Sequence, residues 1–99
     1  MEKLENELAQ IRVQLKRIAT FSKHNSDLLT DIAHQYDSII TKLYKAKPSV
    51  YQQSKQDSNA AIDKLELLQN HDVLTKRNAF NIIKRTLLRA VARDLIIVN

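Results

Sequence analysis

Asp27, Asp31 and His34 come nearest to a metal-binding arrangement in this sequence. On a helix, residues three or four positions apart share a face, so these side chains would form one polar strip. Asp31 and His34 imitate the Glu-x-x-His pair of di-iron helical bundles. Such a centre needs two of these pairs and two further inward-facing glutamates, which this strip lacks. We therefore expect neither a metal site nor a cofactor.

Catalysis by a serine or by paired carboxylates is no better supported. The chain has six serines, and all stand where helix caps or polar helix faces are expected: Ser22, Ser26, Ser38, Ser49, Ser54 and Ser58. A nucleophile elbow requires glycine, and the chain contains none. No two acidic residues are spaced to converge in one cleft. The sequence therefore predicts a protein that is not an enzyme and that acts on no small-molecule substrate.

A third group of residues has a spacing suited to binding. Arg85, Arg89 and Arg93 recur at every fourth position and form one stripe along a helix, bordered by Arg77 and Lys84. No acidic residue lies three or four positions from Arg85 or Arg89, although exposed helices commonly pair opposite charges at that spacing. Arginine makes bidentate contacts with phosphate and carboxylate. The stripe favours a nucleic acid or an acidic protein surface as partner. The alternatives are a solvated face or ion pairs with another helix.

The distribution of charge agrees with a partner at the C-terminal end. The net charge is +5, and residues 71–99 carry six basic and two acidic side chains. Residues 1–46 carry seven basic and six acidic side chains, and residues 47–70 carry three of each. An anionic membrane is a less favoured partner, because the chain has no tryptophan and the apolar face of the last helix is needed for packing.

The elements that must position these residues are helices. The chain of 99 residues has no glycine and one proline, which removes most tight turns and helix breaks. It also has no cysteine, so disulfides and zinc fingers are excluded. No apolar run approaches the ~20 residues of a membrane span, and the first residues lack the pattern of a signal peptide. We expect one all-α domain in the cytoplasm, or in the nucleus or a virion.

The strongest pattern is a heptad series over residues 4–43. Ten of its twelve a and d positions are large and apolar, the spacing at which two helices interlock. We call these ten residues the seam: Leu4, Leu8, Ile11, Leu15, Ile18, Leu29, Ile32, Tyr36, Ile39 and Leu43. From residue 19 onward the flanking e and g positions also become apolar, which is typical of a helix that touches two others in a bundle.

Ser22 and Asn25 interrupt the seam in adjacent layers. In one interpretation a single helix of about 60 Å continues through them, and the polar layer fixes its register. In the other the chain breaks near residues 23–26, where Asn25 or Ser26 caps a new helix led by Asp27. The heptad phase continues across the interruption, which a loop would not require. We therefore expect the continuous helix.

The sequence predicts three segments within the domain. A coiled-coil helix spans residues 1–46 and ends before Pro48, because the residue preceding proline is pushed out of the α region. Residues 47–58 are a polar connection or an exposed helix start, with Ser49 placed to cap a helix. Residues 59–99 form a helical pair that folds back, and Thr75 is placed to cap its basic last helix.

The length of the first helix suggests what the seam is for. A helix of 43 residues is about twice as long as the ~20-residue segments available to cover it. Part of the seam should then remain for a second chain, in a homo- or hetero-oligomer. The sequence favours an assembly or adaptor protein that binds itself or another helical protein. The alternative is a small oligomeric nucleic-acid-binding protein that uses the arginine stripe.

Overall fold

The computed structural model describes residues 2–98, which form four long helices and one single-turn helix. The elements are α1 (Glu2–Arg17), α2 (Lys23–Ala46), α3 (Pro48–Lys64), α4 (Leu67–Asn70) and α5 (Val73–Val98). The all-α prediction is confirmed for this part of the chain. Residues 1 and 99, which end two of the predicted segments, lie outside the described residues.

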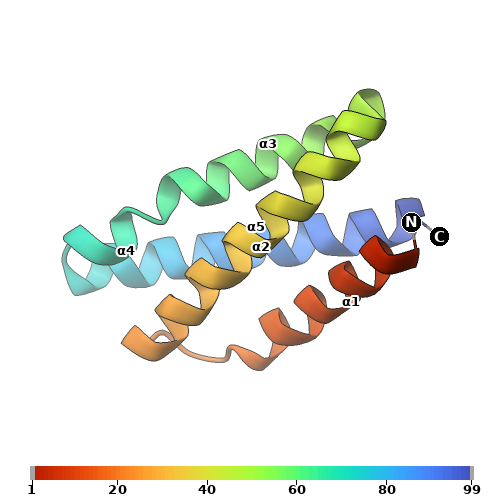
Figure 1. Ribbon diagram of the computed structural model, residues 1–99. Helices are drawn as coiled ribbons and strands as arrows, with labels where there is room; N and C mark the ends of the chain where they lie inside the picture. Colours follow the sequence, from red (N-terminus) through yellow and green to blue (C-terminus); the bar gives the residue numbers. More distant parts are fainter. Residues whose placement is uncertain (1, 99) are drawn as a thin grey trace.

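The four long helices form an up-and-down bundle (Figure 1). Each packs against two neighbours, in the cyclic order α1, α2, α3, α5. Consecutive members of this cycle run antiparallel, so α2 and α5 lie on a diagonal and run in the same direction. The short α4 packs against α5 and closes the end of the bundle at which α3 turns into α5.

The predicted continuous helix over residues 1–46 is wrong. α1 ends at Arg17, five residues follow in a loop, and α2 begins at Lys23. The break lies before the region named in the alternative interpretation, and its cap is Ser22 rather than Asn25 or Ser26. The backbone of Ser22 is extended, and its hydroxyl accepts a hydrogen bond from the Asn25 amide at 3.0 Å.

Three contacts explain why the chain leaves the helical path at this place. Ser22 satisfies one of the amides that the start of α2 leaves without a helical partner. The side-chain amide of Asn25 donates to the carbonyl of Thr20 at 2.7 Å. Phe21 packs edge-to-face on Phe80 of α5, with ring centroids 5.6 Å apart. The two residues that sequence analysis placed in a polar seam layer therefore hold a turn together.

The segment 47–58 is a helix rather than a connection. α3 begins at Pro48, directly after the cap residue Lys47, and continues to Lys64. Proline suits this first helical position because its missing N–H would have no partner there and its φ is already helical. The predicted cap at Ser49 is wrong, because the helix has already begun at Pro48.

The start of the last helix also differs from the prediction. α5 begins at Val73, and the carboxylate of Asp72 accepts a hydrogen bond from the Thr75 amide at 2.7 Å. Asp72 therefore has the capping role that the sequence assigned to Thr75. This backbone hydrogen bond lowers the pKa of Asp72 below the usual aspartate value.

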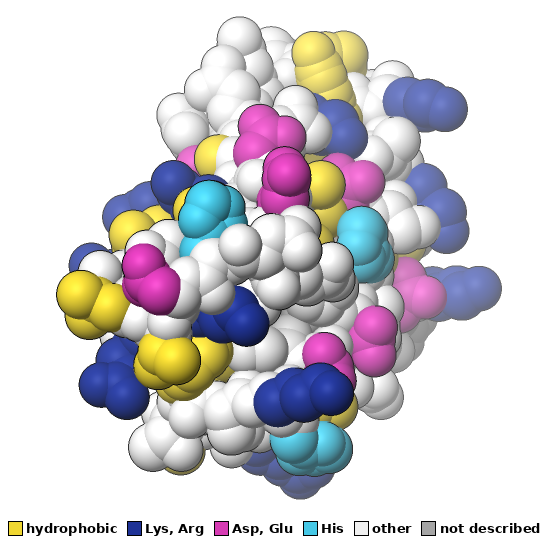
Figure 2. Space-filling view, turned by 90° about the vertical axis from the view of Figure 1, so that its left-hand side faces the viewer, with side chains coloured by type: hydrophobic (Ala, Val, Ile, Leu, Met, Phe, Trp, Pro, Cys, Tyr) yellow, Lys and Arg dark blue, Asp and Glu magenta, His cyan; other side chains and the backbone are white. Residues whose placement is uncertain are grey.

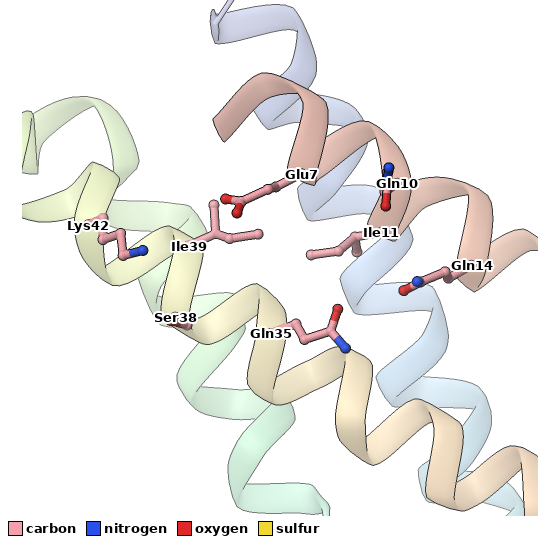
Figure 3. Close-up of a pocket in the computed structure, with 8 residues that line it drawn as sticks. All are labelled: Glu7, Gln10, Ile11, Gln14, Gln35, Ser38, Ile39 and Lys42. Atoms are coloured by element: carbon pink, nitrogen blue, oxygen red, sulfur yellow. The ribbon is translucent and has the colours of Figure 1, made fainter. Parts of the chain in front are cut away.

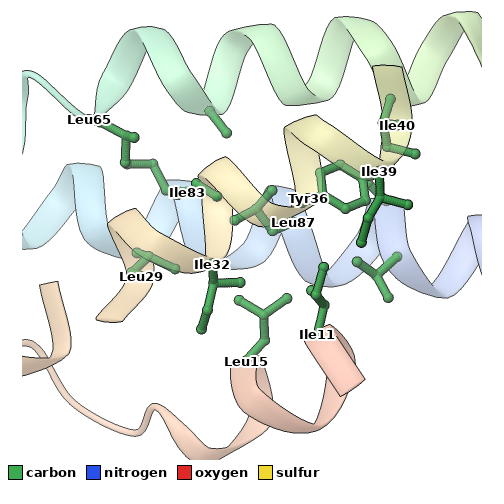
Figure 4. Packing of buried hydrophobic residues seen from close by; sticks show 14 of the residues in the cluster. Ile11, Leu15, Leu29, Ile32, Tyr36, Ile39, Ile40, Leu65, Ile83 and Leu87 are labelled. Atoms are coloured by element: carbon green, nitrogen blue, oxygen red, sulfur yellow. The ribbon is translucent and has the colours of Figure 1, made fainter. Parts of the chain in front are cut away.

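The core runs along the axis of the bundle (Figure 4). It contains buried apolar side chains from all five helices, among them Leu15 of α1, Leu29 of α2, Ala61 of α3, Leu68 of α4 and Leu87 of α5. In α1, α2 and α5 the apolar stripe faces this axis, so helical periodicity predicts which of their residues are buried. The inward face of α3 is mixed, with Ser54, Asp57 and Ser58 buried beside Tyr51 and Ala61.

Candidate functional site

The seam predicted for a partner is the core of this single chain. Nine of its ten residues are buried, and Leu4 is partly buried against the same cluster. The expectation of an uncovered remainder is not met, because the break at residues 18–22 turns one long helix into two that pack together and against α3 and α5. A role of the seam toward a second chain stays a prediction.

Two of the five residues of the basic stripe make contacts inside the bundle. The Arg93 guanidinium donates to the Asp57 carboxylate at 2.7 Å and to the Ser54 hydroxyl at 2.9 Å. The Lys84 ammonium donates to the carbonyl of Ile18, just beyond the end of α1. For Arg93 the alternative of an ion pair with another helix therefore describes the structure better than an exposed stripe does. Lys84 makes a contact that the sequence did not predict, with a backbone carbonyl of the loop after α1.

The other three members of the stripe are exposed on the outer side of α5. Arg77, Arg85 and Arg89 lie at the surface, together with Asn78 and Asn81. α5 contains one acidic residue, Asp94, whose side chain is fully buried. The outer side of α5 consequently presents cationic and amide groups, together with the exposed apolar side chains of Leu74, Ile82 and Ile96, and has no carboxylate of its own. We call Arg77, Asn78, Asn81, Arg85 and Arg89 the basic face.

The neighbouring helix α1 adds to the positive charge beside the basic face. Gln10 and Gln14 of α1 line a groove shared with α2, so that flank of α1 is turned away from α5. Arg12 and Lys16 lie on the opposite flank by helical geometry, and both are exposed. Because α1 packs against α5, this flank borders the basic face, and by helical geometry it carries Glu5 as well as the two cations.

A buried polar cluster at the centre of the bundle was not predicted from the sequence. Asp94 of α5 accepts hydrogen bonds from the hydroxyl of Tyr36 at 2.5 Å and from the hydroxyl of Ser54. Ser54 also accepts from Arg93, which continues the network to Asp57 on α3. The cluster thus links α2, α3 and α5. The sequence pattern that could have revealed it is an aspartate within the apolar stripe of the last helix.

The ionisation of this cluster follows from its burial. Desolvation raises the pKa of Asp94 above the usual aspartate value, although hydrogen bonds from Ser54 and Tyr36 oppose the shift. Burial likewise raises the pKa of Tyr36, and the nearby Asp94 carboxylate raises it further. Tyr36, Ser54 and Asp94 are each 1% exposed or less, so their polar atoms are turned toward one another and closed to a substrate.

A second polar cluster joins α2 to α3 nearer the surface. Asp37 accepts hydrogen bonds from Ser58 at 2.7 Å and from Lys55 at 3.2 Å, and Lys55 also donates to Thr41 at 2.9 Å. Partial burial alone would raise the pKa of Asp37, but the hydrogen bonds from Ser58 and Lys55 and the charge of Lys55 outweigh it. The pKa of Asp37 is therefore lowered.

The groove between α1 and α2 is lined by uncharged polar, charged and apolar side chains (Figure 3). It has a volume of about 370 Å³, and Gln10, Gln14 and Gln35 extend into it between the helices. One carboxylate oxygen of Glu7 is buried there without a hydrogen-bond partner, although Lys42 lines the same groove.

The metal-like strip is at the surface of α2. Asp27, Asp31 and His34 are all exposed, as the helical spacing indicated. Within residues 2–98, no three histidine, cysteine or acidic side chains converge as ligands of a metal ion would. In the same range no helix is both long enough and apolar enough to cross a membrane.

The end of the bundle that carries α4 has a mixed surface (Figure 2). Basic, acidic and histidine side chains alternate there with separate hydrophobic groups. Val73 and Leu74, at the start of α5, are 63% and 67% exposed. Because acidic and basic groups are interspersed, this end has no surface of a single charge comparable to the basic face.

Comparison with known proteins found no match for this chain among protein-family models, curated proteins or solved structures. The inference about function therefore rests on the geometry of the chain itself.

Proposed function

We propose that this protein is a non-catalytic nucleic-acid-binding protein that contacts the phosphate backbone through the basic face of α5. The observation that carries the proposal is the exposure of Arg77, Arg85 and Arg89 on a helix whose one acidic residue is buried. A surface in which cations are not offset by local acids attracts a polyanion, and counterion release from the nucleic acid favours the contact.

The residue types on the basic face suit this partner. Arginine offers a planar fork of donors that matches phosphate oxygens, and asparagine amides donate to phosphate and to base edges. From Arg77 to Arg89 the face extends for about 18 Å at 1.5 Å per residue, a length that spans several successive phosphates. Arg12 and Lys16 of α1 widen the cationic area at its side.

The assembly or adaptor function that the sequence favoured stays a prediction, but the seam is buried in the single chain and offers it no exposed surface there. An acidic protein surface remains the competing partner for the basic face, because carboxylates also bind arginine. The two partners differ in charge density: double-stranded DNA carries one charge per ~1.7 Å of its axis.

Binding of labelled DNA and RNA fragments, measured by fluorescence anisotropy, tests the proposal. The test variant is Arg77→Gln, Arg85→Gln and Arg89→Gln combined. The matched control is Lys42→Gln, Lys45→Gln and Lys47→Gln, which removes the same charge from exposed residues of α2 and the turn after it. If three phosphate contacts are lost, the affinity of the test variant should fall about 40-fold less than that of the wild type between 50 and 200 mM salt.

The control variant should keep the affinity and the salt dependence of the wild type to within a few-fold. Equal losses in both variants would mean that net charge, rather than the basic face, drives binding. Polyglutamate serves as a competitor. If it displaces the nucleic acid as effectively as unlabelled DNA does, an acidic protein is the better assignment of the partner.

A further inference from the structure

The loop between α1 and α2 preserves the heptad phase of the seam, although the monomer does not require it. The heptad positions of the seam continue in phase from Ile18 through Ser22 and Asn25 to Leu29, although the helix is broken between Arg17 and Lys23. Two helices joined by a loop can each face the core with any phase between them. Because the buried residues of α2 fit two heptad registers, a loop of arbitrary length would restore the heptad phase in about two of seven cases.

An opened form of the hairpin does need this phase. If residues 18–22 became helical, α1 and α2 would form one helix with the whole seam on one side. Two such helices can pair antiparallel, so that α1 of each copy covers α2 of the other and takes the place beside α5 that α1 has in the monomer. The loop contains no glycine or proline, so nothing in its composition forbids this helix.

α1 is also the helix that can leave most easily. Hydrogen-bonded side chains tie α2, α3 and α5 together through Asp94 and tie α2 to α3 through Asp37. Among the described side chains, the one hydrogen bond that reaches the end of α1 from another helix is that of Lys84 to the Ile18 carbonyl. Otherwise α1 is held by apolar packing.

We propose that α1 exchanges between two copies of this chain, giving a dimer in which residues 2–46 of each copy form one continuous helix. The partner surface is the one that α1 covers in the monomer, so the apolar contacts of Leu8, Ile11 and Leu15 are remade with the second copy. Exchange of identical elements costs little free energy at equilibrium, because most contacts are the same in the monomer and the dimer.

The differences between the two forms lie in the loop. The monomer keeps the cap by Ser22, the Asn25–Thr20 hydrogen bond and the contact of Phe21 with Phe80. The dimer gains the helical hydrogen bonds of residues 18–22 and places Ser22 and Asn25 of both copies near its two-fold axis. Because these terms oppose each other, the concentration of the protein selects the form.

Lys23→Pro separates the two forms. Lys23 is the first residue of α2 and follows an extended Ser22, which is the conformation that a following proline favours. The monomer therefore accepts proline at this position. A continuous helix does not, because proline removes a hydrogen bond and clashes with the preceding turn in both copies. We expect the association constant to fall at least about a thousandfold. Lys23→Ala is the matched control.

A second variant moves the equilibrium in the other direction. Ser22→Ala combined with Asn25→Leu removes the cap and the turn hydrogen bond, and it fills the interrupted seam layer. After refolding at high protein concentration, light scattering should show more dimer for this variant than for wild type. A variant that stays monomeric at every concentration would overturn the proposal, as would a Lys23→Pro dimer as abundant as that of Lys23→Ala.

Energy transfer within one chain distinguishes exchange from side-by-side association. The chain has no cysteine, so dyes attach only at Lys3→Cys and Ile96→Cys, both exposed and both at the end of the bundle where α1 begins and α5 ends. Doubly labelled chains are refolded with an excess of unlabelled chains. Transfer should be high in the monomer fraction and lost in the dimer fraction, where the two sites lie on the order of 60 Å apart. Dimers that retain the transfer would refute the exchange.

Discussion

α1 and the group formed by α2, α3 and α5 are built from the same kinds of apolar residues but are held in different ways. Leu8 and Leu15 of α1 are as deeply buried as Leu29 of α2 or Leu87 of α5. The group of three helices is in addition joined by hydrogen bonds among Tyr36, Ser54 and Asp94, whereas α1 lies outside this network. Apolar burial stabilises the bundle without fixing the relative positions of its helices. The hydrogen bonds of the polar cluster fix how α2, α3 and α5 lie against one another.

Helices that share one core can therefore differ in how readily each detaches from the others. Apolar contacts can be remade with any surface of similar shape, so a helix held by them alone can exchange. A buried carboxylate is stable only while its hydrogen-bond donors are in place. The helices that it joins are therefore expected to unfold as one unit.

The largest expected effect comes from removing a buried leucine on each side of this division. Leu15→Ala and Leu87→Ala should each lower the free energy of unfolding by about 2–5 kcal/mol. Amide hydrogen exchange should distinguish the two variants. Leu15→Ala should accelerate exchange mainly in α1, whereas Leu87→Ala should accelerate it in every helix. Equal acceleration in all helices by both variants would show that α1 opens only with the rest.

Tyr36→Phe tests the polar cluster directly. Without the phenol, the buried Asp94 loses one of its two hydroxyl donors, which should lower the free energy of unfolding by about 1–3 kcal/mol. Tyr44→Phe, at a half-buried position on the same helix, is the control and should change stability by less than ~0.5 kcal/mol. Similar losses in denaturant melts of both variants would contradict a special role for the cluster.

Titration of Asp94 should make the stability of the fold depend on pH. Its pKa is raised in the folded protein above the value of 3.8, so the folded state binds more protons than the unfolded state between the two values. Stability should therefore fall as the pH rises through this range, by at most about 1.4 kcal/mol per pH unit. Asp94→Asn should remove this slope. Melts are best compared above pH 4, since the lowered pKa of Asp37 makes stability fall in more acidic solution.

Asn25→Leu is expected to destabilise the monomer by about 1 kcal/mol, because it removes the hydrogen bond to the Thr20 carbonyl. A polar residue in a continuous coiled-coil seam would give the opposite result, a higher melting temperature. Thermal melts at low protein concentration measure the monomer. A stabilised variant under those conditions would show that the turn at residues 18–22 is weaker than its contacts indicate.

The smallest effects should come from the exposed arginines. Arg85→Gln and Arg89→Gln together should change the free energy of unfolding by less than ~0.5 kcal/mol, because both side chains are at the surface. Arg93→Gln should be more damaging, by about 1 kcal/mol, since it removes the ion pair with the mostly buried Asp57. If chemical denaturation gives the reverse order, Arg93 does not contribute to joining α3 and α5.

Sequence periodicity predicted burial well and topology poorly. The apolar positions of residues 4–43 are buried as expected, because one stripe per helix must face a core. The break after Arg17 was missed because no glycine or proline marks it. It depends on Ser22 as a cap and on the contact of Phe21 with Phe80, two residues far apart in the sequence.

The candidate site shows the same limit. Helical spacing correctly placed Arg85 and Arg89 on an exposed face, because that inference needs only the angle between residues of one helix. The partners of Arg93 and Asp94 could not be inferred, since they depend on where α2 and α3 lie beside α5. Contacts between helices require the bundle order, which the sequence pattern did not provide.

The antiparallel pairing of α1 with α5 also bears on how fast the fold can be reached. The beginning of α1 and the end of α5 lie at the same end of the bundle (Figure 1). A short linker could join them in a circular permutant whose new ends open within residues 18–22. In that chain α1 follows α5 directly, so the contacts between these two helices become local. The contacts of α1 with α2 become distant in sequence, but they are fewer. The same native bundle would then have a lower contact order and should fold faster.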